Sequence, residues 1–378
     1  MIEYPCYKAA AAHVAPVYFD VDKTVDKACD VIAEVSRQGV RLIAFPETFI
    51  SGYPHWGRIV APIESDHYFR ALAARAIRID GPEIARIRAA AAQFEVTVSI
   101  GFSEGTDVSV GCLWNSNVLI GGDGTLLNHH RKLVPTYVEK LVYANGDGAG
   151  LKVSGTELGR IGMLICGENT NPLARYALMA QGEQVHISSY PSVAPARRPD
   201  GSGGYDIQDG IRIRAASHSF EAKVFNIVAA TPFDATARSF LESLGPDTLA
   251  LLDRGSQTVS MILDPTGKPV CDVLSTEEGI CVAEIDLERA VDLKRIHDVV
   301  GYYNRFDIFD LRVNTAPNLP INLSPRKPCA DVSGERDGVE PAHDVEGFGA
   351  DRAGRAALQR GTGGVEKVHY FGAPDAGE

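Results

Sequence analysis

Three ionisable side chains, Glu47, Lys132 and Cys166, each stand where a short apolar run ends and a turn begins. Such runs predict buried strands, and in an open α/β sheet the ends of strands can bring side chains together on one rim. A cysteine thiol is largely protonated at neutral pH, so it needs a base or a cation nearby to act as a nucleophile. Glu47 could take the thiol proton, and Lys132 could stabilise negative charge on the attacked group. This set indicates attack on an electrophilic carbon that is bonded to nitrogen.

Each of these residues also has a simpler interpretation. A lone cysteine is usually a small buried apolar residue, while Glu47 alone would be a solvated loop carboxylate and Lys132 a surface charge. Only their joint placement at three strand ends favours chemistry. His130 and His186 lie close in the sequence to Lys132 and to the cysteine strand. Pairing of a histidine with the thiol therefore stays open, although we interpret both histidines as structural.

The sequence around Cys166 is typical of a strand-to-helix elbow. The apolar run 159–165 predicts a strand, and Gly167 with the polar residues after it predicts a sharp turn. Pro172 suits the first turn of a helix expected over about 173–182. At such an elbow the sulfur stands above the sheet edge, close to the positive end of a helix.

Apolar periodicity predicts an α/β chain in which strands and helices alternate up to about Asn314. Strands are expected within 7–19 and over 40–45, 96–102, 113–120, 125–131, 159–165, 184–189, 224–230, 256–263, 270–274 and 280–285. Helices are expected over 22–38, 69–77, 82–94, 173–182 and 209–222, with two short ones in 233–253. Turn residues at 121–124 and 264–267 predict two hairpins.

Composition excludes several classes of protein. A formal net charge of −12 argues against general binding to nucleic acids or anionic membranes, which attract basic surfaces. No run approaches the roughly 20 apolar residues of a membrane span, and the start of the chain does not resemble a secretory signal. The seven cysteines are scattered without any Cys-x-x-Cys, so neither a disulfide framework nor a zinc site is expected. This pattern fits a reducing compartment, and we expect a cytoplasmic protein.

Three motifs carry a family resemblance. The stretches FPETFISGYP (45–54), HRKLVPTYVEKLVYANGDG (130–148) and CGENTNPLARYALMAQGEQVHIS (166–188) resemble the nitrilase branch of the carbon–nitrogen hydrolase superfamily, in the family's order. The third motif is the most discriminating, because its Asn-Pro-Leu-x-Arg-Tyr and later Glu-Gln-Val-His resemble nitrilases more than amidases or carbamoylases. The likeness extends over roughly residues 7–312.

The resemblance implies a four-layer α-β-β-α sandwich. It also implies four catalytic residues, Glu47, Lys132, Cys166 and Glu139. Without the resemblance, Glu139 would be interpreted as a charged residue on a loop. Family members usually dimerise across the cysteine face and often build spirals or filaments, so we expect a homodimer that assembles further. No cofactor and no metal are expected, and the only other partner implied is a small nitrile substrate.

The chain is expected to hold one catalytic domain, residues 1–314, followed by a C-terminal extension, 315–378. From Ser324 onward Gly, Ala, Asp and Arg dominate and no apolar period persists. Such a composition buries too little surface to offset the entropy of ordering, so the extension is expected to be largely irregular or disordered. Its short β-prone stretch, 366–371, could dock elsewhere, and we expect the extension to contribute to oligomer assembly.

The resemblance implies a nitrilase, and we expect it to convert an aliphatic or arylaliphatic nitrile to the carboxylic acid and ammonia through a cysteine thioimidate and thioester. A cyanide-converting enzyme or an aliphatic amidase would use the same Glu-Lys-Cys triad and stays an alternative. A non-catalytic, filament-forming homologue is a further alternative, but the intact set of four catalytic residues argues against it.

Residues beside the three motifs are candidates for the substrate pocket, and aromatic or apolar lining suits a hydrophobic nitrile. They are Tyr53, Trp56, Thr136, Gly167, Tyr190 and Pro191. Each could equally serve only to pack its loop. Three positions depart from the family pattern: Gly167 replaces a common aromatic residue, and Tyr302 and Phe306 replace a histidine and a proline. We expect Gly167 to affect the pocket floor and the other two to affect packing or assembly.

Overall fold

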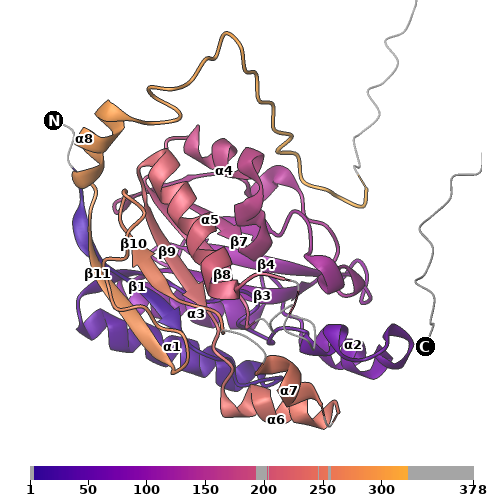
Figure 1. The fold of residues 1–378 in the computed structure, drawn as a ribbon. Helices are drawn as coiled ribbons and strands as arrows, with labels where there is room; N and C mark the ends of the chain where they lie inside the picture. Colours follow the sequence, from indigo (N-terminus) through magenta and orange to yellow (C-terminus); the bar gives the residue numbers. More distant parts are fainter. Residues whose placement is uncertain (1–3, 193–201, 203, 246, 254–256, 322–378) are drawn as a thin grey trace, which may run out of the picture. The chain divides into compact units, whose positions relative to one another are not determined.

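The computed structural model describes residues 4–321 except 193–201, 203, 246 and 254–256, and its described part holds two β-sheets flanked by helices (Figure 1). The first sheet has six strands in the order β11-β1-β2-β3-β4-β5. Their bounds are β1 Cys6–His13, β2 Val40–Ala44, β3 Thr97–Gly105, β4 Leu113–Ile120, β5 Leu126–Arg131 and β11 Gly279–Asp286. Strands β1, β2 and β3 run parallel, while β11, β4 and β5 pair antiparallel with their neighbours.

The second sheet has five strands in the order β10-β9-β8-β7-β6. Their bounds are β6 Ser154–Thr156, β7 Gly159–Ile165, β8 Val185–Tyr190, β9 Phe225–Ala230 and β10 Met261–Leu263. The three central strands are parallel, and the two edge strands are antiparallel. Because parallel strands need crossover connections, helices separate β7, β8 and β9 along the chain.

Helices α1 (Val21–Arg37) and α3 (Pro82–Phe94) cover the outer face of the first sheet (Figure 1). In α1, residues Val25, Ala28 and Ile32 recur at helical spacing and are fully buried against the strands. The Asp20 side chain accepts a hydrogen bond from the Lys23 backbone and caps the helix start. Gly39, at φ +79, ends it, as the sequence predicts.

The inner face of the first sheet packs directly on the second sheet. Side chains alternate across a strand, so Ala10 and Ala12 of β1 face the helices, whereas Ala9 and Ala11 join the core between the sheets. That inner core includes Leu42 from the first sheet and residues of β7, β8, β9 and β10 from the second. The small alanine side chains leave room for the larger residues of the facing sheet.

Helices α4 (Pro172–Met179) and α5 (Ile207–Ala222) pack on the outer face of the second sheet. The Asn171 side chain accepts from the backbone of the first turn of α4, and Pro172 occupies its first position. Ile211 and Ala215 of α5 pack on Val228 of β9. The layers therefore follow the order helix, sheet, sheet, helix, which confirms the four-layer α-β-β-α expectation.

The remaining helices lie at the periphery of these layers. They are α2 (Asp66–Ala73), α6 (Ala235–Ser243), α7 (Thr248–Leu252), α8 (Arg289–Ile296) and the 3₁₀ turns η1 (His55–Arg58), η2 (Pro62–Glu64), η3 (Tyr137–Leu141), η4 (Gly148–Gly150) and η5 (Cys166–Thr170). Among the described helices, none is long and apolar enough to cross a membrane.

Most predicted elements are present, and the main differences are the following. Of the predicted strand 256–263, only β10, Met261–Leu263, is regular among the described residues, and the helix predicted over 69–77 spans Asp66–Ala73. The sequence analysis did not predict β6, which has three residues, or α8, which has eight residues and none of them buried. The predicted strand 270–274 is not a regular strand, although Val270 and Leu274 make backbone bonds to Ile262 and Ser260. The predicted loop 132–150 contains the turns η3 and η4.

The described residues belong to a unit that extends to Asn322. Residues 315–321 contain no helix or strand. The predicted boundary between 314 and 315 stays a prediction, and the expectations for 324–378, including the stretch 366–371, lie outside the described residues.

A glycine in β3 sets the position of the loop that carries Glu47. A Cβ added at Gly101 would lie 2.6 Å from both the Pro46 carbonyl oxygen and the Thr48 nitrogen. We predict that Gly101→Ala lowers the free energy of unfolding by about 1–3 kcal/mol, because overpacked backbone cannot relax freely. Gly155→Ala is the matched control, since a Cβ there meets nothing within 4 Å. Equal urea midpoints for the two variants would contradict this.

Candidate active site

Glu47 lies on the loop after β2, in a fully enclosed position. Its Oε1 accepts hydrogen bonds from Asn115 Nδ2 at 2.6 Å and from Lys132 Nζ at 2.7 Å. Its Oε2 is buried and has no hydrogen-bond partner among the described residues. A buried carboxylate oxygen without a partner is unusual, so this oxygen is available to accept a proton.

Lys132 follows β5 and connects two carboxylates. Its Nζ lies 2.7 Å from Glu47 Oε1 and 2.7 Å from Glu139 Oε2. The exposed fractions of Glu47, Lys132 and Glu139 are 1%, 1% and 2%. Water therefore does not screen these ion pairs, which interact far more strongly than they would at the surface.

Glu139 is fixed by the turn η3, in which it is the third residue. Its Oε2 accepts from the Thr136 backbone at 2.9 Å, and the Thr136 side chain accepts in return from the Glu139 backbone. This reciprocal arrangement is a capping box. Glu139 Oε1 accepts from Tyr53 Oη at 3.0 Å. Both oxygens are thus occupied, and the carboxylate is held against Lys132.

Cys166 begins η5 at the end of β7 and has φ +50, a left-handed backbone conformation that residues other than glycine rarely adopt. The neighbouring Glu168 fixes the turn. Its carboxylate accepts from the backbone of Ile165 at 2.7 Å and of Leu133 at 2.5 Å, and it bonds His130 at 2.9 Å. Glu168 therefore connects the end of the cysteine strand to the loop that carries Lys132.

The charges around the thiol determine its protonation. Burial raises the pKa of Cys166 well above its ordinary value; Glu47 adds to this shift and Lys132 opposes it. Burial also raises the pKa of Glu47 to about 7, although Lys132 opposes that shift. Burial would lower the pKa of Lys132, but Glu139 and Glu47 outweigh it and hold this pKa well above its ordinary value. The resting arrangement is therefore a thiol, an ammonium and a base whose pKa lies near neutral pH.

The expectation that Glu47, Lys132 and Cys166 meet at the rim of a single sheet is wrong. Glu47 and Lys132 follow β2 and β5 of the first sheet, whereas Cys166 follows β7 of the second. Apolar runs mark buried strands but do not indicate which strands share a sheet. The three side chains come together because the two sheets pack face to face.

The structure brings three of the predicted pocket residues to this cluster. Tyr53 and Thr136 bond Glu139. Gly167 faces Thr136, since a Cβ at Gly167 would lie 2.9 Å from Thr136 Oγ1. Because that hydroxyl caps η3, a larger residue at 167 would disturb the turn that holds Glu139.

The other pocket candidates lie in packed positions. Tyr190 is buried beside Cys166 in one hydrophobic cluster, and its hydroxyl has no partner among the described groups. Pro191 follows it and is buried. Trp56 packs in another cluster and stacks on Tyr68. The assignment of all six residues to a substrate pocket stays a prediction.

Sequence reasoning missed several residues that shape the site. Asn115, in the middle of β4, holds Glu47, and Arg214 of α5 acts on the thiol electrostatically. Neither had a signal in the sequence, because each approaches the site only through tertiary packing. Glu168 stands two residues after Cys166 inside the third motif, so its position was visible but its role was not.

Comparisons with known proteins place the chain in a family. Residues 8–295 match the carbon–nitrogen hydrolase family, and the chain belongs to it. A nitrilase of Paraburkholderia phymatum is 32% identical over 333 residues, covering 87% of this chain and 93% of its own. A cyanide hydratase of Gibberella zeae is 35% identical over 320 residues, covering 82% and 87%. A carbon–nitrogen hydrolase structure from Helicobacter pylori shares the fold with a TM-score of 0.61 at 19% identity, covering 80% and 97%.

The family and these relatives define the protein as an enzyme of the nitrilase branch, a hydrolase of carbon–nitrogen bonds. The resemblance found in the three sequence motifs is thereby confirmed.

The ion pairs of Lys132 give a stability prediction. Lys132→Met leaves two buried carboxylates without a counter-charge, so the free energy of unfolding falls by about 3–5 kcal/mol at neutral pH. Adding Glu47→Gln and Glu139→Gln to the same chain removes both charges and recovers most of the loss. Denaturant titration of the single and triple variants measures both effects. A triple variant no more stable than the single one would contradict the pairing.

Proposed function

We propose that the protein is a nitrilase that hydrolyses aliphatic or arylaliphatic nitriles to the carboxylic acid and ammonia, with Cys166 as the nucleophile. The observation that carries this proposal is the buried chain Glu47–Lys132–Glu139, whose charges act directly on the Cys166 thiol. The identity to nitrilases supports the choice of a nitrile over other carbon–nitrogen substrates.

The first step transfers the thiol proton to Glu47. The Oε2 atom is the candidate acceptor, because Oε1 already binds Asn115 and Lys132. The thiolate sulfur then forms a bond with the nitrile carbon, and one π pair of the C≡N bond moves to nitrogen. That nitrogen takes up a proton from Glu47, giving a neutral thioimidate. Lys132 stays protonated and donates hydrogen bonds to the developing negative charge.

Water completes the reaction in two additions. Glu47, ionised again, deprotonates a water that adds to the thioimidate carbon. Glu47 returns the proton of this water to the nitrogen, and the tetrahedral species carries a hydroxyl and an amino group. The hydroxyl proton passes to the nitrogen through Glu47, ammonia leaves, and a thioester remains on Cys166. Glu47 deprotonates a second water that adds to the thioester carbon, the C–S bond breaks to release the acid, and the proton on Glu47 returns to the Cys166 sulfur. Glu139 keeps the Lys132 ammonium oriented throughout.

The predicted pocket residues support a hydrophobic nitrile. Tyr53 and Tyr190 supply aromatic surface near the reacting groups. Gly167 lets the Thr136 hydroxyl lie close to the cysteine turn, since a Cβ there would stand only 2.9 Å from that oxygen. The homodimer and its further assembly into spirals or filaments remain part of this proposal.

A cyanide hydratase is the second candidate, favoured by 35% identity to a protein of that name. The two activities share every step up to the tetrahedral species. If its C–S bond breaks before the nitrogen leaves, the nitrogen is retained in an amide. Product analysis therefore separates the two functions.

We predict that wild-type protein releases acid and ammonia from a panel of small nitriles and that Cys166→Ala releases neither. Deletion of the nucleophile should lower the rate by at least about 1,000-fold, because the covalent route is lost. Chromatography of the acid and amide, with free cyanide included in the panel, identifies the product. Equal ammonia release by the two proteins would refute the assignment. Amide as the main product would favour the hydratase.

The raised pKa of Glu47 predicts the pH dependence of kcat/KM. Only the ionised carboxylate is a base, so the rate rises with pH, is half-maximal near pH 7 and falls about tenfold per unit below it. The pKa values of Cys166 and Lys132 lie well above their ordinary values, so the rate should stay on a plateau above pH 8. An uncharged nitrile avoids substrate titration. A half-maximal point near pH 4.5 would count against Glu47 as the base.

A further inference from the structure

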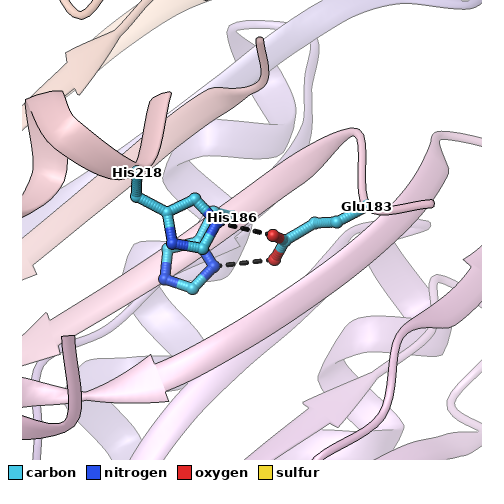
Figure 2. Close-up of side chains that lie close together, drawn as sticks. All are labelled: Glu183, His186 and His218. Carbon is cyan, nitrogen blue, oxygen red and sulfur yellow. Dashed lines mark hydrogen bonds and ion pairs between the residues drawn. The ribbon is translucent and has the colours of Figure 1, made fainter. Parts of the chain in front are cut away.

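A second buried group of titratable side chains is connected to the cysteine turn through Asn169, outside the cluster that the proposed mechanism uses. Figure 2 shows Glu183, His186 and His218, which come from the turn before β8, from β8 and from α5. Glu183 Oε1 lies 2.7 Å from His186 Nδ1, and its Oε2 lies 2.6 Å from His218 Nε2. The two rings stack with centroids 3.7 Å apart. All three side chains are buried.

A glycine in the cysteine strand makes room for this group. Gly162 of β7 pairs with His186 of β8, and a Cβ added at Gly162 would overlap Glu183 Oε1. The carboxylate thus lies directly over the backbone of the strand that ends at Cys166. Any side chain at 162 would push the carboxylate off its two histidine partners.

Asn169 connects the group to Cys166. Its Nδ2 donates to the Cys166 carbonyl at 3.1 Å and to the Leu164 carbonyl at 3.4 Å. These two carbonyls can only accept, so they fix the orientation of the amide. Its Oδ1 then faces His186 Nε2 at 2.9 Å and Ser188 Oγ at 3.1 Å. His186 therefore bridges Glu183 and the amide that holds the Cys166 backbone.

Both ring nitrogens of His186 face acceptors, so the geometry requires a proton on each. Burial would raise the pKa of Glu183, but His186 and His218 outweigh it and bring it to about 2, which keeps the carboxylate ionised. Burial and then the charge of His186 lower the pKa of His218 to about 4, so that ring stays neutral. Glu183 thus accepts a hydrogen bond from His186 at one carboxylate oxygen and from His218 at the other.

The same atoms lie within 4.8 Å of one another, close enough to hold a metal ion. Their arrangement favours hydrogen bonds between the side chains over the coordination of a metal ion. Each carboxylate oxygen bonds a different ring, and stacked rings direct their nitrogens along parallel lines rather than toward one point. The second nitrogen of His186 is already committed to Asn169.

We propose that His186, held by Glu183 and His218, is a positioning residue for the nucleophile. It orients Asn169, whose amide grips the Cys166 carbonyl and keeps Cys166 at φ +50. A residue other than glycine holds this conformation only where its surroundings enforce it. The inference rests on the proposed function, because it assigns the role of nucleophile to Cys166.

Two substitutions at His186 separate positioning from packing. Gln places an amide nitrogen where Nε2 lies and keeps the bond to Asn169, whereas Asn places one where Nδ1 lies and keeps only the bond to Glu183. We expect His186→Asn to lower kcat by about 100-fold with KM nearly unchanged, as a nucleophile displaced by about 1 Å would. His186→Gln should retain at least about ten times more activity than His186→Asn. Equal losses in both variants, in proportion to their melting temperatures, would overturn the proposal.

A second measurement does not depend on nitrile hydrolysis. The rate at which iodoacetamide alkylates Cys166, followed by peptide mass spectrometry, should fall in His186→Asn and in Asn169→Asp, which loses the donor to the Cys166 carbonyl. Gly155→Ala should alkylate like the wild type. If the wild type hydrolyses no nitrile, the proposed function fails, but these rates still decide the positioning role. Wild-type alkylation in Asn169→Asp refutes it, even if neither His186 variant folds.

Metal content tests the rival interpretation of the group. We expect elemental analysis of the purified full chain to give well under one equivalent of zinc or other transition metal. One equivalent that disappears in Glu183→Gln would identify a metal site and overturn the assignment of the group to positioning.

Discussion

The ammonium of Lys132 between the carboxylates of Glu47 and Glu139 is the interaction on which the rest of the site depends. Both carboxylates are almost completely buried, and an isolated buried charge is far too costly to keep. The ammonium compensates both at once, and the compensation is incomplete, since two negative groups share one positive partner. Burial, together with this imbalance, leaves Glu47 with a pKa near neutral pH, which suits the general-base role that we propose for it.

The fold places these groups by packing two sheets on each other. The first sheet supplies Glu47 and Lys132, and the second supplies Cys166. Small residues make the close approach of backbone and loops feasible: alanines in β1 at the interface, Gly101 beneath the Glu47 loop and Gly162 beneath Glu183. Hydrogen bonds from Glu168 then join the cysteine turn to the Lys132 loop, so the relative position of the two sheets fixes that of the reacting groups.

The cysteine turn is thus enclosed by two buried polar networks with different tasks. In the first network, Lys132 stabilises charge and its carboxylate partner Glu47 transfers protons in the proposed reaction. In the second network, Glu183, His186 and Asn169 form a chain of hydrogen bonds that ends at the Cys166 carbonyl. This chain fixes the backbone of Cys166 and thereby orients its sulfur. Buried networks of this kind keep a turn in a single conformation only when nearly every donor and acceptor is paired. Among the described residues of these networks, Glu47 Oε2, Asn115 Oδ1 and His218 Nδ1 are exceptions, and Glu47 Oε2 is the atom to which we assign the proton transfer.

Most of the elements and the identity of the central residues could be predicted from the sequence alone. Apolar periods located α1, β2, β7 and the turn at Cys166, because local periodicity and turn chemistry are properties of short stretches of chain. The motifs around Glu47, Lys132 and Cys166 indicated the family to which the chain belongs. Three features are visible only in the folded chain: these residues come from two sheets, Asn115 holds Glu47, and Glu183 joins two histidines over Gly162. Except for Glu183 and His186, these contacts join positions tens of residues apart, and no local pattern records which strand packs on which.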